Sequence, residues 1–158
     1  MNWQEVCEHP GLQDLPFKIE LNEYGKIVMS PVKFEHSVFQ GEIIRLLNTL
    51  VQGGRSAVEC AISTRKGTKV ADAAWLSEER YKQNKHKTEC EIAPEICVEV
   101  VSSSNTEDEM REKQGLYFEK GAKEVWFCEE NGNMSFYSLT GKLERSLLVP
   151  EFPQRIEI

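Results

Sequence analysis

Two acidic side chains occupy positions where the sequence otherwise predicts buried β-strands. Glu99 lies in APEICVEVVSSS, from Ala93 to Ser104, and Asp72 lies in the earlier run VADAAWL. Runs rich in Ile, Val and Ala are typical of strands that a sheet buries on both faces. Burying a lone carboxylate there costs several kcal/mol unless a proton, a cation or a partner relieves it. The two acids therefore need a common explanation.

The simplest explanation is that the two strands are neighbours and that their carboxylates converge on a divalent cation. Mg²⁺ or Mn²⁺ takes a pair of carboxylates together with water and substrate oxygens, and such a pair with its metal is typical of phosphodiester hydrolysis. We therefore predict that Asp72 and Glu99 are metal ligands and catalytic residues. The alternative is that both side chains point to solvent from edge strands.

A lysine is expected beside the two acids, where its charge would orient the attacking water or neutralise charge on the phosphate. The segment NTEDEMREKQGLYFEKG follows the strand of the second acid and predicts a helix with acids in its first turn and a glycine at its end. At about 100° per residue, Lys113 falls among the apolar residues Met110 and Tyr117 of one helix face. We predict Lys113 as the third catalytic residue; the alternative is a lysine whose ammonium group only reaches solvent.

Positive charge is concentrated in the middle of a chain that is acidic as a whole. The net charge is −7, but residues 25–88 hold eleven Lys and Arg against six acids. Two basic clusters flank a short apolar run in this region, and we expect them to grip the phosphates of nucleic acid; solvated loops are the alternative. The predicted nucleic-acid-binding residues are Arg65, Lys66 and Lys69 in the first cluster and Arg80, Lys82, Lys85 and Lys87 in the second.

The cysteines and serines argue against other kinds of site. The five cysteines are odd in number and show no CxxC spacing, which argues against a disulfide framework and a tetrahedral zinc site. We expect buried free thiols at Cys60, Cys97 and Cys128, which lie in or beside apolar runs. The serines from Ser102 to Ser104 lack a glycine elbow and a histidine base, so we expect them to cap the following helix.

The remaining signals predict the elements that position these residues. FKIEL and KIVMS flank NEYG and predict a hairpin over residues 17–30. Apolar spacings of three and four predict an amphipathic helix from residue 34 to a pair of glycines at 53 and 54. A second hairpin is expected over residues 57–76 with its turn at KGTK, followed by a short helix capped by Ser77. At the C-terminus, strands are predicted in KEVWFCEE, NMSFYSL, KLERSLLV and RIEI.

This order of elements predicts one α+β domain over residues 1–158. A chain of 158 residues is long enough to bury a core without disulfide or metal staples. No apolar run approaches the roughly 20 residues that a membrane span needs, and the N-terminus lacks the regions of a signal peptide. We therefore expect a cytoplasmic protein that does not bind membranes.

A succession of segments over about residues 15–140 resembles one known family. It runs from FKIELNEYGKIVMSP through EHSVFQGEIIRLL and VAD to APEICVEVVSSSNTEDEMREKQGLYFEKGAKEVWFCEENGN. It is similar to the bacterial Uma-two family of restriction-endonuclease-like proteins, within the PD-(D/E)xK nuclease superfamily. The resemblance implies a restriction-endonuclease-like fold of the α+β class, α/β-like in its layers, with helices flanking a central mixed β-sheet and the acids and a lysine at one end of that sheet.

Motif matching assigns the same three residues to the family's site. Asp72 takes the place of the first acid, with Ala71 where a proline usually stands, and Glu99 takes the place of the second. The superfamily lysine two residues further on is absent, because that position is Val101. The resemblance implies that Lys113, on the following helix, has taken over its role.

Two auxiliary residues follow from the same resemblance. His36 matches a histidine common in the family at the entry to the first helix, and Glu42, further along that helix, would be an auxiliary metal ligand. A helix cap and a solvated face are the alternatives for these two residues.

The function expected from these observations is a Mg²⁺- or Mn²⁺-dependent endonuclease that acts on DNA. A homodimer is expected because two strands are naturally cut by two sites. The first alternative is a relative of the nuclease fold that binds nucleic acid or protein without cleavage, favoured by Val101 and by the acidic net charge. The second is an oligomeric scaffold with Trp75, Trp126 and Phe127 in its core or interface.

Overall fold

A mixed β-sheet of six strands forms the centre of the protein, which the computed structural model describes over all residues, Met1–Ile158. The strands lie in the order β3-β4-β5-β6-β7-β8, and only β5 and β6 are parallel. This architecture confirms the predicted α+β fold with a central mixed sheet. The strands are β3 (Gly54–Thr64), β4 (Gly67–Ser77), β5 (Ile96–Val100), β6 (Glu124–Cys128), β7 (Met134–Ser138) and β8 (Gly141–Leu143).

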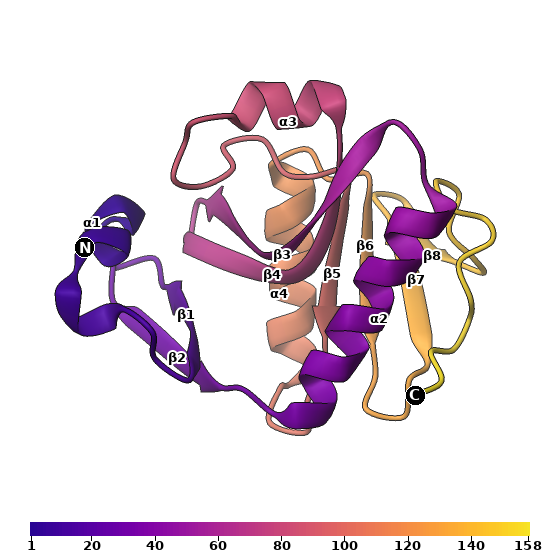
Figure 1. The fold of residues 1–158 in the computed structure, drawn as a ribbon, viewed down its shortest axis with the longest axis horizontal. Helices are drawn as coiled ribbons and strands as arrows, with labels where there is room; N and C mark the ends of the chain where they lie inside the picture. The colour runs from indigo at the N-terminus through magenta and orange to yellow at the C-terminus, as the bar shows by residue number, and fades with distance from the viewer.

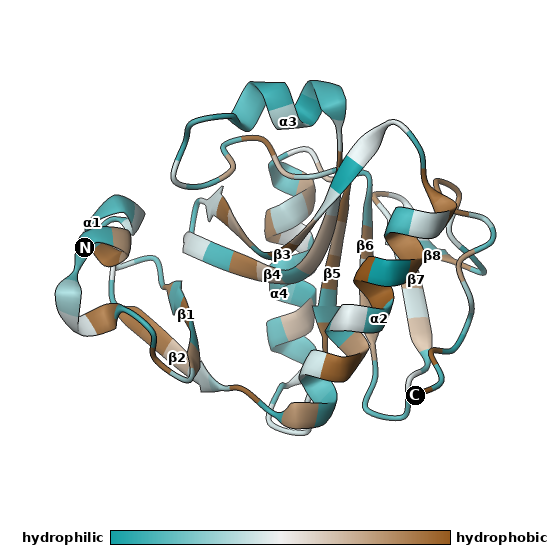
Figure 2. Cartoon of the chain, in the orientation of Figure 1, coloured by the Kyte–Doolittle hydropathy of each residue, from teal (hydrophilic) through white to brown (hydrophobic).

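Two helices cover the two faces of the sheet (Figure 1). α2 (Phe34–Leu50) packs Phe39 and Ile43 into the core on one face, and α4 (Glu107–Glu119) packs Tyr117 into the core on the other. Every residue of β5 and β6 is buried between these layers, and both strands are mostly brown in Figure 2. The parallel pair is thus the middle of a three-layer structure, as expected for runs that are apolar without alternation.

Two of the predicted capping residues begin helices as expected, but the serines from Ser102 to Ser104 cap no helix: Ser102 bonds with Asn105 and Ser104 instead. Ser77 accepts a hydrogen bond at the start of α3 (Glu78–Asn84), and Thr106, rather than Asn105, does so at the start of α4. Gly121, with φ 103°, ends α4 in a conformation that favours glycine. α3 buries no residue and is teal along its length in Figure 2. No helix of the protein has both the length and the apolar character that crossing a membrane requires.

The N-terminal hairpin forms a separate two-stranded sheet. Its strands are β1 (Phe17–Leu21) and β2 (Ile27–Pro31), which confirm the predicted hairpin. They follow α1 (Trp3–Glu8) and a 3-10 turn (Pro10–Leu12), two elements that the sequence did not predict. In Figure 1 this N-terminal region lies to one side of the central sheet.

Polar contacts dock the hairpin onto β4. Glu20 accepts a hydrogen bond from the backbone N–H of Val70 at 2.7 Å, and Lys69 Nζ donates to the carbonyl oxygen of Leu21 at 3.1 Å. Gly67, with φ 87°, lies so close to the Leu21 carbonyl that a side chain at this position would overlap it. The hairpin therefore reaches β4 through its backbone and its charged residues.

The predicted position of the turn in the second hairpin was wrong by about two residues. The ladder pairs Thr64 with Gly67, so the turn consists of Arg65 and Lys66 rather than KGTK. Gly67 directly follows these two residues in the left-handed conformation, which is the place of glycine after a type I turn with a G1 bulge. As a result Lys69 lies within β4 instead of in a loop.

Two predicted C-terminal strands were also wrong. KLERSLLV forms only the short β8, and RIEI forms no strand. The buried carboxylate of Glu124 accepts hydrogen bonds from Ser146 Oγ at 2.6 Å and from the backbone N–H groups of Leu147 and Leu148 at 3.0 and 2.9 Å. Those N–H groups are no longer free for a ladder, so the segment after β8 packs as irregular chain.

The thiols agree with the prediction. All five cysteines are free, and Cys60, Cys97 and Cys128 are buried. Cys60 Sγ lies 3.7 Å from Cys90 Sγ, a hydrogen-bonding contact between two thiols that form no disulfide.

Candidate active site

The two predicted acids lie opposite each other where the β4–β5 ladder ends. The last paired residues are Ala73 on β4 and Val98 on β5, so the next position in the register brings Asp72 opposite Glu99. Opposed residues of an antiparallel pair project to the same face. The strands separate at this point, and Asp72 Oδ2 accepts the N–H of Val100 at 2.7 Å in place of a ladder bond. Both acids are buried, and the pairing of β4 with β5 confirms the prediction that neighbouring strands bring them together.

The other neighbour of β4 is also distorted beside Asp72. Glu59 on β3 stands opposite Asp72 in the register, but the pairing skips this position, and Glu59 has φ 48°. A non-glycine residue in the left-handed region is strained and often marks a functional site. Asp72 is thus the point at which β4 loses regular pairing on both sides.

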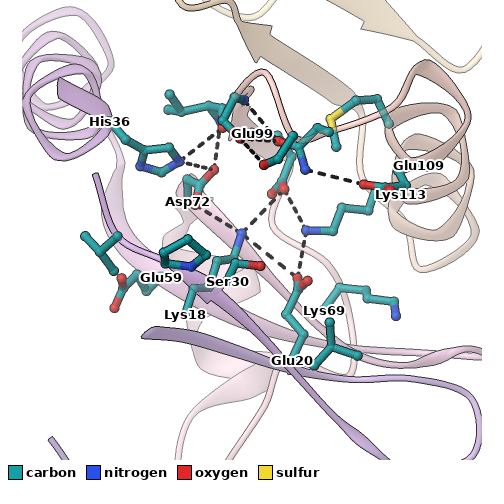
Figure 3. A pocket seen from close by; sticks show the side chains of 18 of the residues that line it. Lys18, Glu20, Ser30, His36, Glu59, Lys69, Asp72, Glu99, Glu109 and Lys113 are labelled. Atoms are coloured by element: carbon teal, nitrogen blue, oxygen red, sulfur yellow. Dashed lines mark hydrogen bonds and ion pairs between the residues drawn. The ribbon is translucent and has the colours of Figure 1, made fainter. Parts of the chain in front are cut away.

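Two ammonium groups join the carboxylates (Figure 3). Lys18 Nζ, from β1, lies 3.1 Å from Asp72 Oδ1 and 3.5 Å from Glu99 Oε1. Lys113 Nζ, from α4, lies 2.7 Å from the same Glu99 oxygen and 2.7 Å from Glu20 Oε2. Glu99 therefore shares one cation with Asp72 and another with Glu20, and Lys113 reaches the position predicted for it.

Burial and charge act differently on the two acids. Burial would raise the pKa of Asp72, but the hydrogen bond from His36 and the charge of Lys18 outweigh it and lower this pKa to about 2. Burial raises the pKa of Glu99, and the charges of Lys113 and Lys18 oppose this rise without cancelling it. The remaining oxygen of Glu99 accepts a hydrogen bond from the buried hydroxyl of Tyr117 at 3.2 Å. The two environments thus shift the pKa values of the two carboxyl groups in opposite directions.

Of the two auxiliary residues, the structure brings only His36 to the site. His36 Nε2 lies 3.1 Å from the carbonyl oxygen of Val100 and 3.4 Å from Asp72 Oδ2, and its hydrogen bond with Asp72 raises its pKa. Glu42 faces away from the pocket and pairs with Arg45 on the same helix. Its position one helical turn further does not bring its side chain to Asp72.

The pocket around these residues has an excess of negative charge. It has a volume of about 270 Å³. Six carboxylates and four ammonium groups line it, so its net charge is −2 when His36 is neutral. The carboxylates belong to Glu20, Glu59, Asp72, Glu99, Glu109 and Glu112, and the ammonium groups to Lys18, Lys33, Lys69 and Lys113. One divalent cation would balance this charge, and phosphate alone would not be attracted by it.

The first basic cluster lies partly at the pocket. Lys69 lines it, whereas Arg65 pairs with Glu119 at 3.0 Å and Lys66 pairs with Glu112 at 3.4 Å. These are exposed ion pairs of the kind that contributes little to stability. The acids of α4 therefore offset part of the charge that was predicted to grip phosphates.

The second basic cluster lies at the other end of the sheet. Arg80 donates to the carbonyl oxygens of Ala93 and Gly121, at 2.6 and 3.0 Å, so it connects α3 to loops at the end opposite Glu99. Lys87 pairs with Glu91. Together with Lys82 and Lys85, these residues are not part of the pocket. A role for this cluster in nucleic-acid binding stays a prediction.

The oxygen donors suit a hard divalent cation. Asp72 and Glu99 already converge on one cation, the ammonium group of Lys18, which marks the position where an ion would meet both carboxylates. No group of three or more His, Cys, Asp or Glu side chains is arranged to hold a metal. Two protein carboxylates are nevertheless a usual ligand set for Mg²⁺, which keeps several waters. These two residues could therefore hold the metal.

Sequence reasoning did not single out Lys18, Glu20 or the hydroxyl of Tyr117 for this site. Lys18 and Glu20 alternate in FKIEL, so they share one face of a strand, and both side chains are largely buried. A lysine and a glutamate on the same face of a hairpin strand could have indicated a charged partner. Nothing in the sequence shows that this partner is the Asp72–Glu99 pair.

Comparisons with known proteins agree with this architecture. The family model Uma2, described as "putative restriction endonuclease", matches residues 3–156. A solved structure, that of a putative nuclease belonging to DUF820 from Anabaena variabilis, superposes with a TM-score of 0.70 at 17% identity, over 97% of this chain and 82% of that one. No curated protein matches the sequence. On the extent of the family match, this chain belongs to the Uma2 family of putative restriction endonucleases.

Proposed function

We propose that the protein is a metal-dependent endonuclease that hydrolyses phosphodiester bonds in DNA, with Asp72 and Glu99 as the ligands of Mg²⁺ or Mn²⁺. One observation carries this proposal: two buried carboxylates from adjacent strands contact a single cation in a pocket whose net charge is −2. Family membership supports a nuclease, and the choice of DNA as substrate is part of the proposal.

The residues of the pocket would divide the work between them. A bound Mg²⁺ or Mn²⁺ lowers the pKa of its water and shields charge that develops on the phosphate. Asp72 is held ionised by His36 and Lys18, so its oxygens are available as ligands at neutral pH. Lys113 Nζ is fixed between Glu99 and Glu20, 2.7 Å from each, where its charge can stabilise a phosphate oxygen. His36 orients Asp72 through Nε2.

A second function, binding without cleavage, is favoured by the neutralisation already present in the site. Lys18 contacts both carboxylates, and no buried side-chain nitrogen or oxygen in the protein lacks a hydrogen-bond partner. A site that is satisfied without a metal does not need one to be stable. The lysine expected two residues after Glu99 is also replaced, by Val101.

Thermal unfolding with added Mg²⁺ or Mn²⁺ tests the metal. An ion that binds the folded protein raises its melting temperature. At an ion concentration of one hundred times the Kd, the free energy of unfolding increases by about 2.7 kcal/mol. We expect this rise in the wild type and in Glu42→Gln, whose carboxylate lies outside the pocket, and no rise in Glu99→Gln. A rise that persists in Glu99→Gln would place the ion elsewhere, and no rise in any protein would remove the metal from the proposal.

Cleavage assays then separate the enzyme from the binder. Supercoiled plasmid and structured RNA are incubated with the protein and Mg²⁺ or Mn²⁺. We expect the plasmid to be nicked or linearised, and Lys113→Met to lower the rate by about 10²–10³. Gel-shift binding of plasmid fragments without any cleavage by the wild type would favour the second function. Cleavage of the RNA alone would show that the substrate is RNA and not DNA.

A further inference from the structure

Lys18 reaches the acids from outside the central sheet. It lies on β1, in the N-terminal hairpin, whereas Asp72 and Glu99 lie on β4 and β5. Its side chain is 14% exposed, and its Nζ contacts one oxygen of each acid. Figure 3 shows this nitrogen joined by dashed lines to the carboxylates of Asp72, Glu99 and Glu20. The fold thus supplies a cation to these carboxylates without any metal.

This position is the one that a metal ion would need. A divalent ion bound by both carboxylates lies about 2.0–2.1 Å from each ligand oxygen if it is Mg²⁺. Lys18 Nζ stands 3.1 Å from Asp72 Oδ1 and 3.5 Å from Glu99 Oε1, so the ion would be almost in contact with the ammonium group. Two cations that close repel each other strongly in a buried site. The ion and the ammonium group therefore exclude each other.

Resting on the function proposed above, we propose that Lys18 is a tethered counter-ion: it occupies the cation position between Asp72 and Glu99 in the metal-free protein and leaves it when a divalent ion binds. The ammonium group and the metal ion compete for the same position. An interaction that stabilises Lys18 there therefore weakens the binding of the metal by the same factor. Lys18 thus keeps the metal-free site folded and sets its metal affinity.

Glu20 provides a place for Lys18 to move. Glu20 Oε2 lies 4.0 Å from Lys18 Nζ, two residues away on the same face of β1, and it also contacts Lys113. A lysine has a long flexible side chain, so its ammonium group can shift from the acids to Glu20 without movement of the hairpin backbone. Lys113 contacts Glu99 but not Asp72, so it does not lie between the two acids and can remain paired with Glu20. This gives Glu20, which sequence reasoning missed, a specific task in the exchange.

Calorimetric titration of metal-free protein with MnCl₂ tests the competition. The variant is Lys18→Met, and the matched control is Lys33→Met, which removes the same charge from the pocket lining but no contact with either acid. We expect Lys18→Met to bind Mn²⁺ at least about fivefold more tightly than the wild type, and Lys33→Met to change the affinity by less than about threefold.

The outcomes separate this inference from the proposed function. If the wild type binds Mn²⁺ and Lys18→Met binds it equally or more weakly, or if both variants tighten binding alike, the counter-ion role is overturned while the metal site stands. If none of the three proteins binds Mn²⁺, the metal site and the counter-ion role are overturned together. Circular dichroism of each variant shows whether it is folded.

A measurement on the wild type covers the case in which Lys18→Met does not fold. Crystals grown with MnCl₂ locate the ion by its anomalous signal. We expect the ion between Asp72 and Glu99, with Lys18 Nζ beyond hydrogen-bonding distance of both carboxylates. An ion ligated by both acids while Lys18 keeps its contacts with them would overturn the counter-ion role.

Discussion

Replacing Tyr117 by Phe is a direct test of how Glu99 tolerates its burial. The Tyr117 hydroxyl donates to Glu99 Oε2 at 3.2 Å, both side chains are buried, and this is the only hydrogen bond to that oxygen. The two ammonium groups contact the other oxygen, Oε1. Tyr117→Phe therefore deletes one hydroxyl, leaves the aromatic ring in the core, and leaves one oxygen of a buried carboxylate without a partner.

The expected loss of stability follows from this geometry. A hydrogen bond to a charged group contributes about 1.5–3 kcal/mol. The distance of 3.2 Å exceeds the usual O–H···O range of about 2.5–3.0 Å, so we expect the lower end, about 1.5 kcal/mol. For a domain of this size that corresponds to a fall in melting temperature of roughly 3–6 °C.

Urea unfolding at neutral pH measures this loss. The matched control is Tyr24→Phe, because Tyr24 is 77% exposed and its hydroxyl has no partner; we expect its stability to change by less than about 0.5 kcal/mol. The same Tyr117→Phe change in a Glu99→Gln background should cost less, since the charge is gone. A cost as small as that of the control, or one equally large without the Glu99 charge, would refute the reasoning.

Three further predictions concern the scaffold and its acids. Gly67→Ala should lower stability by more than about 1 kcal/mol in urea unfolding, because Gly67 has φ 87° and abuts the N-terminal hairpin, whereas Gly41→Ala, within a helix and with free space around it, should raise it by about 0.5–1 kcal/mol. Glu124→Gln should cost about 2 kcal/mol or more and make the segment after β8 sensitive to limited proteolysis, since the carboxylate holds that segment through three hydrogen bonds. Asp72 has a pKa of about 2 in the folded protein against an ordinary 3.8, so its charge stabilises the fold above pH 3.8 and this contribution disappears as the pH falls toward 2. Asp72→Asn should therefore show a shallower loss of stability than the wild type in acid titrations over that window, and an unchanged slope would contradict the lowered pKa of Asp72.

The central pair of acids was predictable because its signal is local. An acid within an apolar strand is conspicuous in the sequence, and two such strands are most simply explained as neighbours. Lys113 was predictable for a similar reason, since helical spacing places it on the apolar face next to Tyr117. The ladder joins β4 to β5, the next strand in the chain, and α4 is the helix that follows β5.

The residues that sequence reasoning missed depend on tertiary docking. Lys18 and Glu20 reach the pocket only because the N-terminal hairpin packs on β4, and this contact is made by backbone groups and charged side chains that show no sequence pattern. The second basic cluster was expected to grip phosphates together with the first, but α3 places it at the end of the sheet opposite Glu99. Sequence distance does not report which end of a strand a loop lies on.

The prediction of the C-terminal strands was wrong for a related reason. Hydrophobic alternation in KLERSLLV is compatible with a strand, but the N–H groups of Leu147 and Leu148 bond to the buried Glu124 instead of to a ladder. The carboxylate of Glu124 on β6 thus prevents the segment after β8 from adding a further strand to the sheet. Its effect on a segment about twenty residues later cannot be read from local propensity.

Burial of an acid is by itself a poor marker of an active site, as Glu124 illustrates. Its carboxylate is as deeply buried as those of Asp72 and Glu99, yet it receives only neutral donors, from Trp126, Ser146 and two backbone amides. Asp72 and Glu99 instead contact the ammonium group of Lys18, which we propose is displaced by a divalent ion. A search for catalytic centres in unfamiliar folds should therefore rank hidden acids by whether their neutralising partner can be exchanged, and would then discard Glu124 while keeping the pair.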